Sequence, residues 1–174
     1  MSLAGVAFMA LLWEASIVLW SIGFMELGIG DNDPKDFGIV LLSAGFMETI
    51  SLIFIIAAKD VFGAVAAAGF IMLLWVLGAH LMLKSNGKLL NHSVWFTGVY
   101  FLLAGFFTID HKLYSLTTLF WLLVIVTWTI SLRNYGEGKS WGKFFGVIAG
   151  ISSFLTAILL FAMAFAGAIG HPLP

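Results

Sequence analysis

The amino-acid sequence predicts an all-α membrane protein, a compact bundle of six transmembrane helices with both termini extracytoplasmic. Three observations lead to this fold class. Of the 174 residues, 61% are hydrophobic and only 10% are charged, whereas soluble domains are about 45–50% apolar and about 25% charged. Six apolar runs each approach the roughly 20 residues that a helix needs to cross a bilayer. Basic residues collect in alternate connections between the runs, as the positive-inside rule requires.

The first three runs cover residues 3–25, 37–58 and 62–83. The first run lacks the basic leader of a signal peptide and carries Glu14 near its middle, so we expect a membrane helix there. The turn-forming pair Asp33-Pro34 precedes the second run.

The last three runs cover residues 93–109, 113–132 and 144–168. The turn-forming pair Asn86-Gly87 precedes the fourth run, and a polar stretch at 133–143 precedes the sixth. All the runs are too long for barrel strands, and none alternates with a period of two. Residues 1–174 are therefore predicted to form a single six-helix transmembrane channel domain.

The distribution of basic residues predicts the orientation. Lysine and arginine mark the cytoplasmic side of a membrane protein. The first, third and fifth connections carry six of them, namely Lys35, Lys84, Lys88, Arg133, Lys139 and Lys143. The second and fourth connections carry two, Lys59 and Lys112. We therefore expect a multi-pass protein of the cell (inner) membrane with both ends outside.

Composition also excludes several functions. The chain has no cysteine and a formal net charge of −1, which rules out disulfides and thiolate metal sites and gives no basic footprint for nucleic acid. The motifs of zinc proteases, nucleotide-binding loops and serine hydrolases are absent. We expect no enzyme, no metal and no cofactor, and a small-molecule permeant as the partner.

Two glutamates stand near the centres of the first and second runs, Glu14 and Glu48. A charge at mid-membrane costs a few kcal/mol even on lenient scales, so such residues normally face a protein interior or a water path. A short connection makes the two helices antiparallel, so the carboxyl groups can lie at similar depth, where one would tend to hold a proton. The functional interpretation is a polar station that binds a small permeant; the alternative is a protonated carboxyl bonded to its neighbours.

Tryptophans repeat at a helical spacing. Trp121 and Trp128 are seven residues apart, as are Trp13 and Trp20, so each pair shares one helix face. Stacked indoles can form a flat slot for a planar neutral solute. Ordinary packing and interfacial anchoring is the alternative, and the residues alone favour it.

A series of short landmarks occurs in a characteristic order. It comprises Leu11-Leu12-Trp13, Asp33-Pro34-Lys35, Phe62-Gly63, Asp110-His111-Lys112, Gly142-Lys143-Phe144 and Leu155-Thr156-Ala157. In this order and spacing, over nearly the whole chain, the sequence resembles the urea/amide channel family. The resemblance implies a homo-hexamer with one pore per protomer, lined by Trp121 and Trp128 on the fifth helix and Trp13 on the first. Ser152 stands where the acid-gated urea channel has a carboxylate, so acid gating is not expected.

A second resemblance points to the acetate/succinate permeases, which have the same six-helix, hexameric architecture. Gly98-Val99-Tyr100 and Phe107-Thr108 resemble the fourth helix of that family. In that register Phe8, Phe70 and Leu123 would form a hydrophobic constriction. The signature before the first helix is missing, and that family has its termini inside, contrary to the lysine distribution. We therefore rank the urea/amide reading first.

The predicted function is facilitated diffusion of urea or short-chain amides through a narrow aromatic-lined pore in each protomer of a lipid-embedded homo-hexamer. The solute would shed water, stack on Trp121 and Trp128 and donate its N–H groups to Glu14 or Glu48. Phe70, Leu123 and Ser152 complete the predicted pore lining. The alternative is an acetate or succinate channel or a proton-coupled permease.

Overall fold

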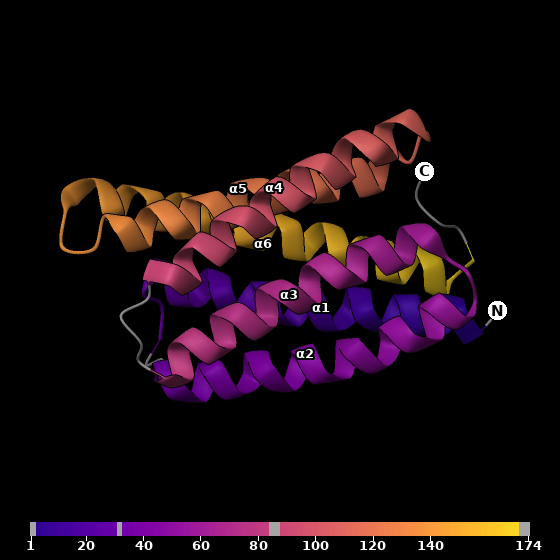
Figure 1. The fold of residues 1–174 in the computed structure, drawn as a ribbon, viewed down its shortest axis with the longest axis horizontal. Coiled ribbons are helices and arrows are strands. Elements are labelled where there is room, and N and C mark those ends of the chain that lie inside the picture. Colours follow the sequence, from indigo (N-terminus) through magenta and orange to yellow (C-terminus); the bar gives the residue numbers. More distant parts are fainter. Residues whose placement is uncertain (1–2, 31–32, 84–87, 171–174) are drawn as a thin grey trace.

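The computed structural model describes residues 3–30, 33–83 and 88–170, and this part of the chain forms six long α-helices. Their bounds are α1 Leu3–Leu27, α2 Pro34–Ala57, α3 Val61–Leu83, α4 Lys88–Asp110, α5 Tyr114–Tyr135 and α6 Ser140–Ala168. Each is long and apolar enough to cross a membrane. The predicted all-α fold with six spans is confirmed (Figure 1).

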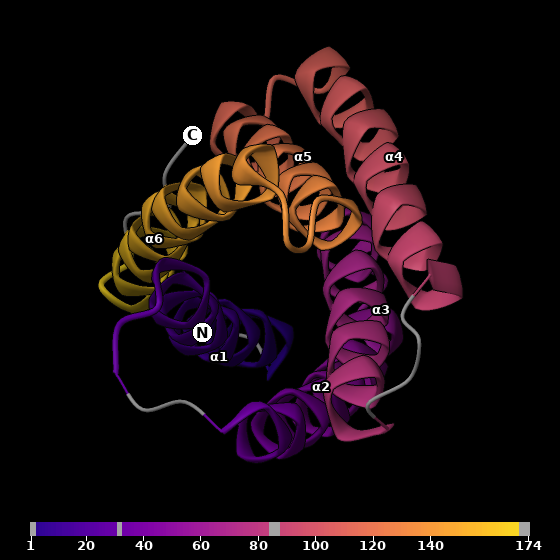
Figure 2. The same ribbon diagram turned by 90° about the vertical axis from the view of Figure 1, so that its left-hand side faces the viewer.

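The helices form a ring in sequence order. Each packs against its neighbours in the chain, and α6 closes the ring on α1. Figure 2 views the helix ring roughly along the helices and shows α4 on its outer side. There α4 packs chiefly against α5 and less against α3. Since consecutive helices run in opposite directions, α1 begins and α6 ends at one end of the bundle (Figure 1). We call the other end, where α1, α3 and α5 end, the lysine-rich end.

Five helices extend two or more residues beyond the predicted apolar runs, all at the lysine-rich end; among them is α2, which begins at Pro34 instead of residue 37. The first continues to Leu27, the fourth begins at Lys88, the fifth continues to Tyr135 and the sixth begins at Ser140. Hydropathy detects only the part of a helix that is apolar, whereas the backbone ladder continues into the polar interfacial layer. Glu26, Asn91 and Arg133 therefore belong to helices rather than to connections.

The helix ends use recognisable caps. Asp33 accepts a hydrogen bond from the amide of Lys35 (2.8 Å) and is followed by Pro34 as the first residue of α2. Asp60 accepts from the amide of Gly63 (2.9 Å) at the start of α3. At the ends of α2 and α4 the chain reverses through Lys59 and Lys112, whose φ angles of 59° and 60° lie in the left-handed region.

Both the interior and the outer surface of the ring are apolar. The interior is filled by side chains with at most 1% exposure, among them Leu19, Leu41, Phe70, Leu73, Phe101, Phe120 and Leu123. Outward faces expose large apolar groups such as Ile53, Leu103 and Phe144. A soluble protein rarely exposes so much apolar surface. This surface is suited to lipid or to neighbouring copies within a membrane.

Candidate functional site

A buried carboxyl group lies halfway along α2. Glu48 has no exposed surface, and neither of its carboxyl oxygens has a hydrogen-bond partner among the described residues. Glu14, about halfway along α1, is partly exposed, and its Oε2 is also buried without a partner. The two groups are close enough that their charges would repel each other. The structure thus places a fully buried, unpaired carboxyl group near a partly exposed one, as the antiparallel arrangement of α1 and α2 predicts.

Aromatic side chains fill the interior of the helix bundle near this depth. Gly45 faces Leu74 across the α2–α3 seam, so Glu48, one turn further along α2, is level with Phe70. The Phe70 ring lies 6.1 Å from that of Phe101, which stacks on Phe120 at 6.0 Å between centroids. We call Phe70, Phe101 and Phe120 the phenylalanine cluster. The phenylalanine cluster is fully buried and fills the interior of the helix ring near the depth of Glu48.

The three residues of the alternative constriction lie inside or against the core. Phe70 and Leu123 are fully buried, and Phe8 is partly buried and packs on the same core. Ser152 is also buried, and its hydroxyl donates to the carbonyl of Ala149 (3.1 Å) within its own helix. This self-satisfied hydroxyl has no spare donor for a solute.

The tryptophans predicted for the pore lie in the seam between α4 and α5. Trp128 stacks on Trp95 with 5.1 Å between ring centroids and donates its Nε1–H to the Trp95 carbonyl (3.2 Å). A Cβ added to Gly98 would collide with Trp128, and one added to Gly105 would collide with Trp121. Trp121 is 40% exposed. Each indole thus fills the space above a glycine of α4, which is the packing alternative of the sequence analysis.

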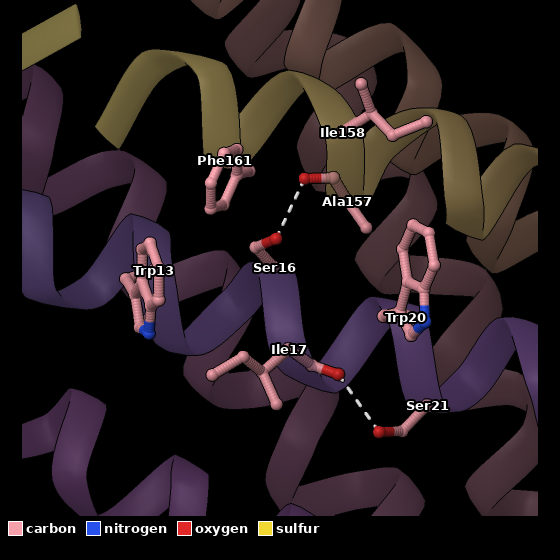
Figure 3. A pocket seen from close by; sticks show the side chains of 8 residues that line it. All are labelled: Trp13, Ser16, Ile17, Trp20, Ser21, Ala157, Ile158 and Phe161. Atoms are coloured by element: carbon pink, nitrogen blue, oxygen red, sulfur yellow. Dashed lines mark hydrogen bonds between the residues drawn. The ribbon is translucent and has the colours of Figure 1, made fainter. Parts of the chain in front are cut away.

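Trp13 lies on the outside of the ring, in a groove between α1 and α6. Figure 3 shows this groove, of about 350 Å³, with Trp13 and Phe161 on one side and Trp20 and Ile158 on the other. Trp13 contacts Phe161 at 5.1 Å between centroids. At the floor of the groove the Ser16 hydroxyl donates to the Ala157 carbonyl (2.9 Å). The first-helix tryptophans therefore face lipid or another copy of the chain rather than the interior of one protomer.

Sequence reasoning missed one buried acid. Glu26 lies just beyond the predicted run 3–25, and α1 continues through it to Leu27. Its side chain is only 2% exposed and lies 3.3 Å from Arg133 Nε, measured to Oε2. The signal that could have found it is helical spacing: Glu26 is one turn beyond Ile22, on the same face as Leu19.

The comparison with known proteins adds no relative: no protein-family model, no curated protein and no solved structure matches this chain. The class follows from the fold and the site alone. Six helices that can each cross a bilayer indicate a multi-pass membrane protein. A closed ring of such helices with orphaned carboxyl groups in its walls is compatible with a membrane channel or transporter.

Proposed function

We propose that the protein is a membrane channel for facilitated diffusion of small neutral solutes, urea or short-chain amides, with one route through each protomer and no enzymatic step. The observation that carries the proposal is Glu48, fully buried with both carboxyl oxygens unpaired beside Glu14. A buried polar group without a partner costs roughly 1–3 kcal/mol of stability. A group kept at that cost in the wall of a helix ring is suited to binding a passing solute.

The solute's N–H groups supply the missing donors. Removing an amide from water without replacing its hydrogen bonds costs roughly 2–7 kcal/mol. Bonds donated to Glu48 and Glu14 offset part of that cost, whereas an anion, which offers only acceptors, gains nothing from carboxyl oxygens. Near the depth of the glutamates, the phenylalanine cluster offers flat faces against which a planar amide can slide once the rings rotate apart.

The assembly that we propose is a homo-hexamer embedded in lipid, as the family resemblance implies. The apolar outer faces and the groove framed by Trp13 and Trp20 provide surface for neighbouring copies. The predicted slot between Trp121 and Trp128 stays a prediction. Because both indoles pack over α4 glycines, we expect Trp121→Ala to act through the packing of α4 on α5.

Liposome swelling tests the proposal. Purified protein is reconstituted, and uptake of urea, acetamide and acetate is compared for the wild type, Glu48→Met and the surface control Glu137→Gln. We expect urea and acetamide uptake that falls at least about tenfold in Glu48→Met, because methionine fills the space without accepting hydrogen bonds. The control should match the wild type. Amide uptake that is equal in all three proteins would contradict the proposal.

A proton-coupled acetate permease is the second candidate, favoured by the burial of Phe70 and Leu123 with Phe8 against the same core. Glu48→Gln separates the two. Glutamine still accepts a hydrogen bond but cannot exchange a proton. A diffusion channel for amides keeps most of its activity in this variant, while proton-coupled acetate uptake is lost.

A further inference from the structure

A second polar pocket lies inside the ring at its lysine-rich end. It is a cavity of about 40 Å³ between α1, α2, α3 and α5. Its walls are mostly apolar, with Phe37, Leu41 and Leu77 among them. Its polar groups are those of Glu26, His80, Arg133 and Asn134.

Two buried polar atoms of this cavity lack hydrogen bonds. Arg133 Nε approaches Glu26 Oε2 to 3.3 Å, but no hydrogen bond reaches that oxygen, nor does one reach His80 Nδ1, among the described residues. Arg133 is held from the other side, where its Nη1 donates to Asn134 Oδ1 (3.1 Å) and Asn134 donates to Asn91 Oδ1 (3.3 Å). Arg133 therefore contacts both Glu26 and Asn134, while the Glu26 Oε2 oxygen has no hydrogen bond among the described residues.

We propose that this cavity is a binding site for a small neutral amide, whose N–H donates to Glu26 Oε2 and whose carbonyl accepts from the Arg133 guanidinium. The inference rests on the proposed function and adds to it a second station nearer the lysine-rich end. A buried water needs about 10–15 Å³, so the cavity holds about three waters, which is the size of a solute with three or four non-hydrogen atoms. Urea and acetamide have four.

The charge of the site selects against ions. Glu26 and Arg133 offset each other, so an anion that approaches Arg133 also meets the Glu26 carboxylate, and a cation that approaches Glu26 meets the guanidinium. A solute that carries both a donor and an acceptor satisfies both partners. The Asn134 amide next to them is neutral and adds no net charge.

The ion pair also separates the cavity from the solution. Glu26 and Arg133 line a surface groove of about 400 Å³ at the same end, together with Lys139 and Lys143. The Arg133 side chain is 45% exposed, whereas that of Glu26 is 2% exposed. Arg133 thus lies between the groove and the cavity, and a solute enters the cavity by passing its side chain.

The sequence offers a direct probe, because Arg133 is the only arginine in the chain. Protein labelled with 15N-arginine in lipid nanodiscs gives a single Nε resonance in nuclear magnetic resonance. We expect this resonance to shift saturably when urea or acetamide is added, and not with acetate. In Glu26→Gln the half-saturation concentration should rise about tenfold, because the variant loses one charge-assisted hydrogen bond to the solute. The matched control Asp36→Asn removes an exposed acid at the same end and should leave it unchanged.

The wild-type titration alone can overturn the inference: it is wrong if amides leave the resonance in place, or if acetate shifts it instead. Urea uptake into liposomes, measured on the same protein, keeps the two proposals distinguishable. Urea uptake without a shift of the resonance refutes amide binding in the cavity and leaves the channel proposal standing. A shift without amide uptake refutes the channel proposal and leaves the binding site standing.

Discussion

At the scale of single residues, Glu48 is the fully buried acid at which the chain departs from the rules of a stable membrane bundle. Buried polar groups are normally hydrogen-bonded, yet both oxygens of Glu48 lack a partner while the side chain has no exposed surface. Two buried threonines follow the rule, since Thr156 donates to the Ser152 carbonyl (2.7 Å) and Thr127 to that of Leu123 (2.8 Å). An exception of this kind is typical of a functional site.

This exception predicts an opposition between stability and function. We expect Glu48→Met to raise the melting temperature in detergent, because it removes an unsatisfied polar group worth about 1–3 kcal/mol. The same variant should lose solute uptake. Thermal unfolding of the wild type, Glu48→Met and the exposed control Glu137→Gln measures the effect. A melting temperature that falls in Glu48→Met would show that an unseen partner stabilises the carboxyl group.

At the scale of elements, close helix approach depends on glycines that face large side chains. In lipid, helices associate through packing rather than through the hydrophobic effect, and small residues let their backbones come near. Gly38 and Gly78 do this between α2 and α3, where a Cβ on either would meet the carbonyl oxygen of the other at 3.0 or 3.1 Å. Gly98 allows the same close approach of α4 to α5, because the Trp128 indole, held by Trp95, fills the space where a Cβ would lie.

Gly98→Ala is therefore expected to destabilise the α4–α5 seam. Overpacking typically costs about 1–3 kcal/mol, which exceeds the gain of at most about 1 kcal/mol from alanine's helix propensity. Gly146→Ala is the matched control, since its Cβ would come no nearer than 3.4 Å to Arg133 Cγ. Melting temperatures should fall for the first variant and hold or rise for the second. Equal values for the two would mean that Trp128 moves aside freely.

The turn between α4 and α5 carries a different kind of strain. Lys112 has a φ of 60°, and its amide and that of Leu113 bond back to Ile109 and Thr108 (both 3.0 Å), the arrangement that usually has glycine at this place. A left-handed conformation costs a residue with a Cβ roughly 1–2 kcal/mol. Lys112→Gly should therefore stabilise the protein by about 1 kcal/mol, measured by thermal unfolding. A lower melting temperature would indicate that the lysine side chain contributes more than the strain costs.

At the scale of the whole molecule, the antiparallel ring sorts the charges between its two ends. The lysine-rich end carries the surface groove and the cavity described above, together with Glu26, Arg133, Lys139 and Lys143. Lys59 and Lys112 lie at the other end. Such an asymmetry sets the orientation in the membrane.

This arrangement predicts the topology, which labelling can measure directly because the native chain contains no cysteine. We expect Lys112→Cys to react with a membrane-impermeant maleimide in intact cells, and Glu137→Cys to react only after the membrane is permeabilised. Both positions are exposed at helix ends, so access to the reagent is matched. The reverse pattern would place both termini in the cytoplasm and favour the acetate permease reading.

The number of helices and their antiparallel order followed from the sequence, because each span depends on a local quantity, the length of an apolar run against the thickness of the bilayer. The proximity of Glu14 and Glu48 followed too, since a short connection joins their helices. Which side of each helix faces inward did not follow. In a membrane both the core and the lipid are apolar, so hydropathy carries no inward or outward signal. Packing alone placed Trp13 outside the ring, set Trp128 over Gly98, and brought Glu26 to Arg133.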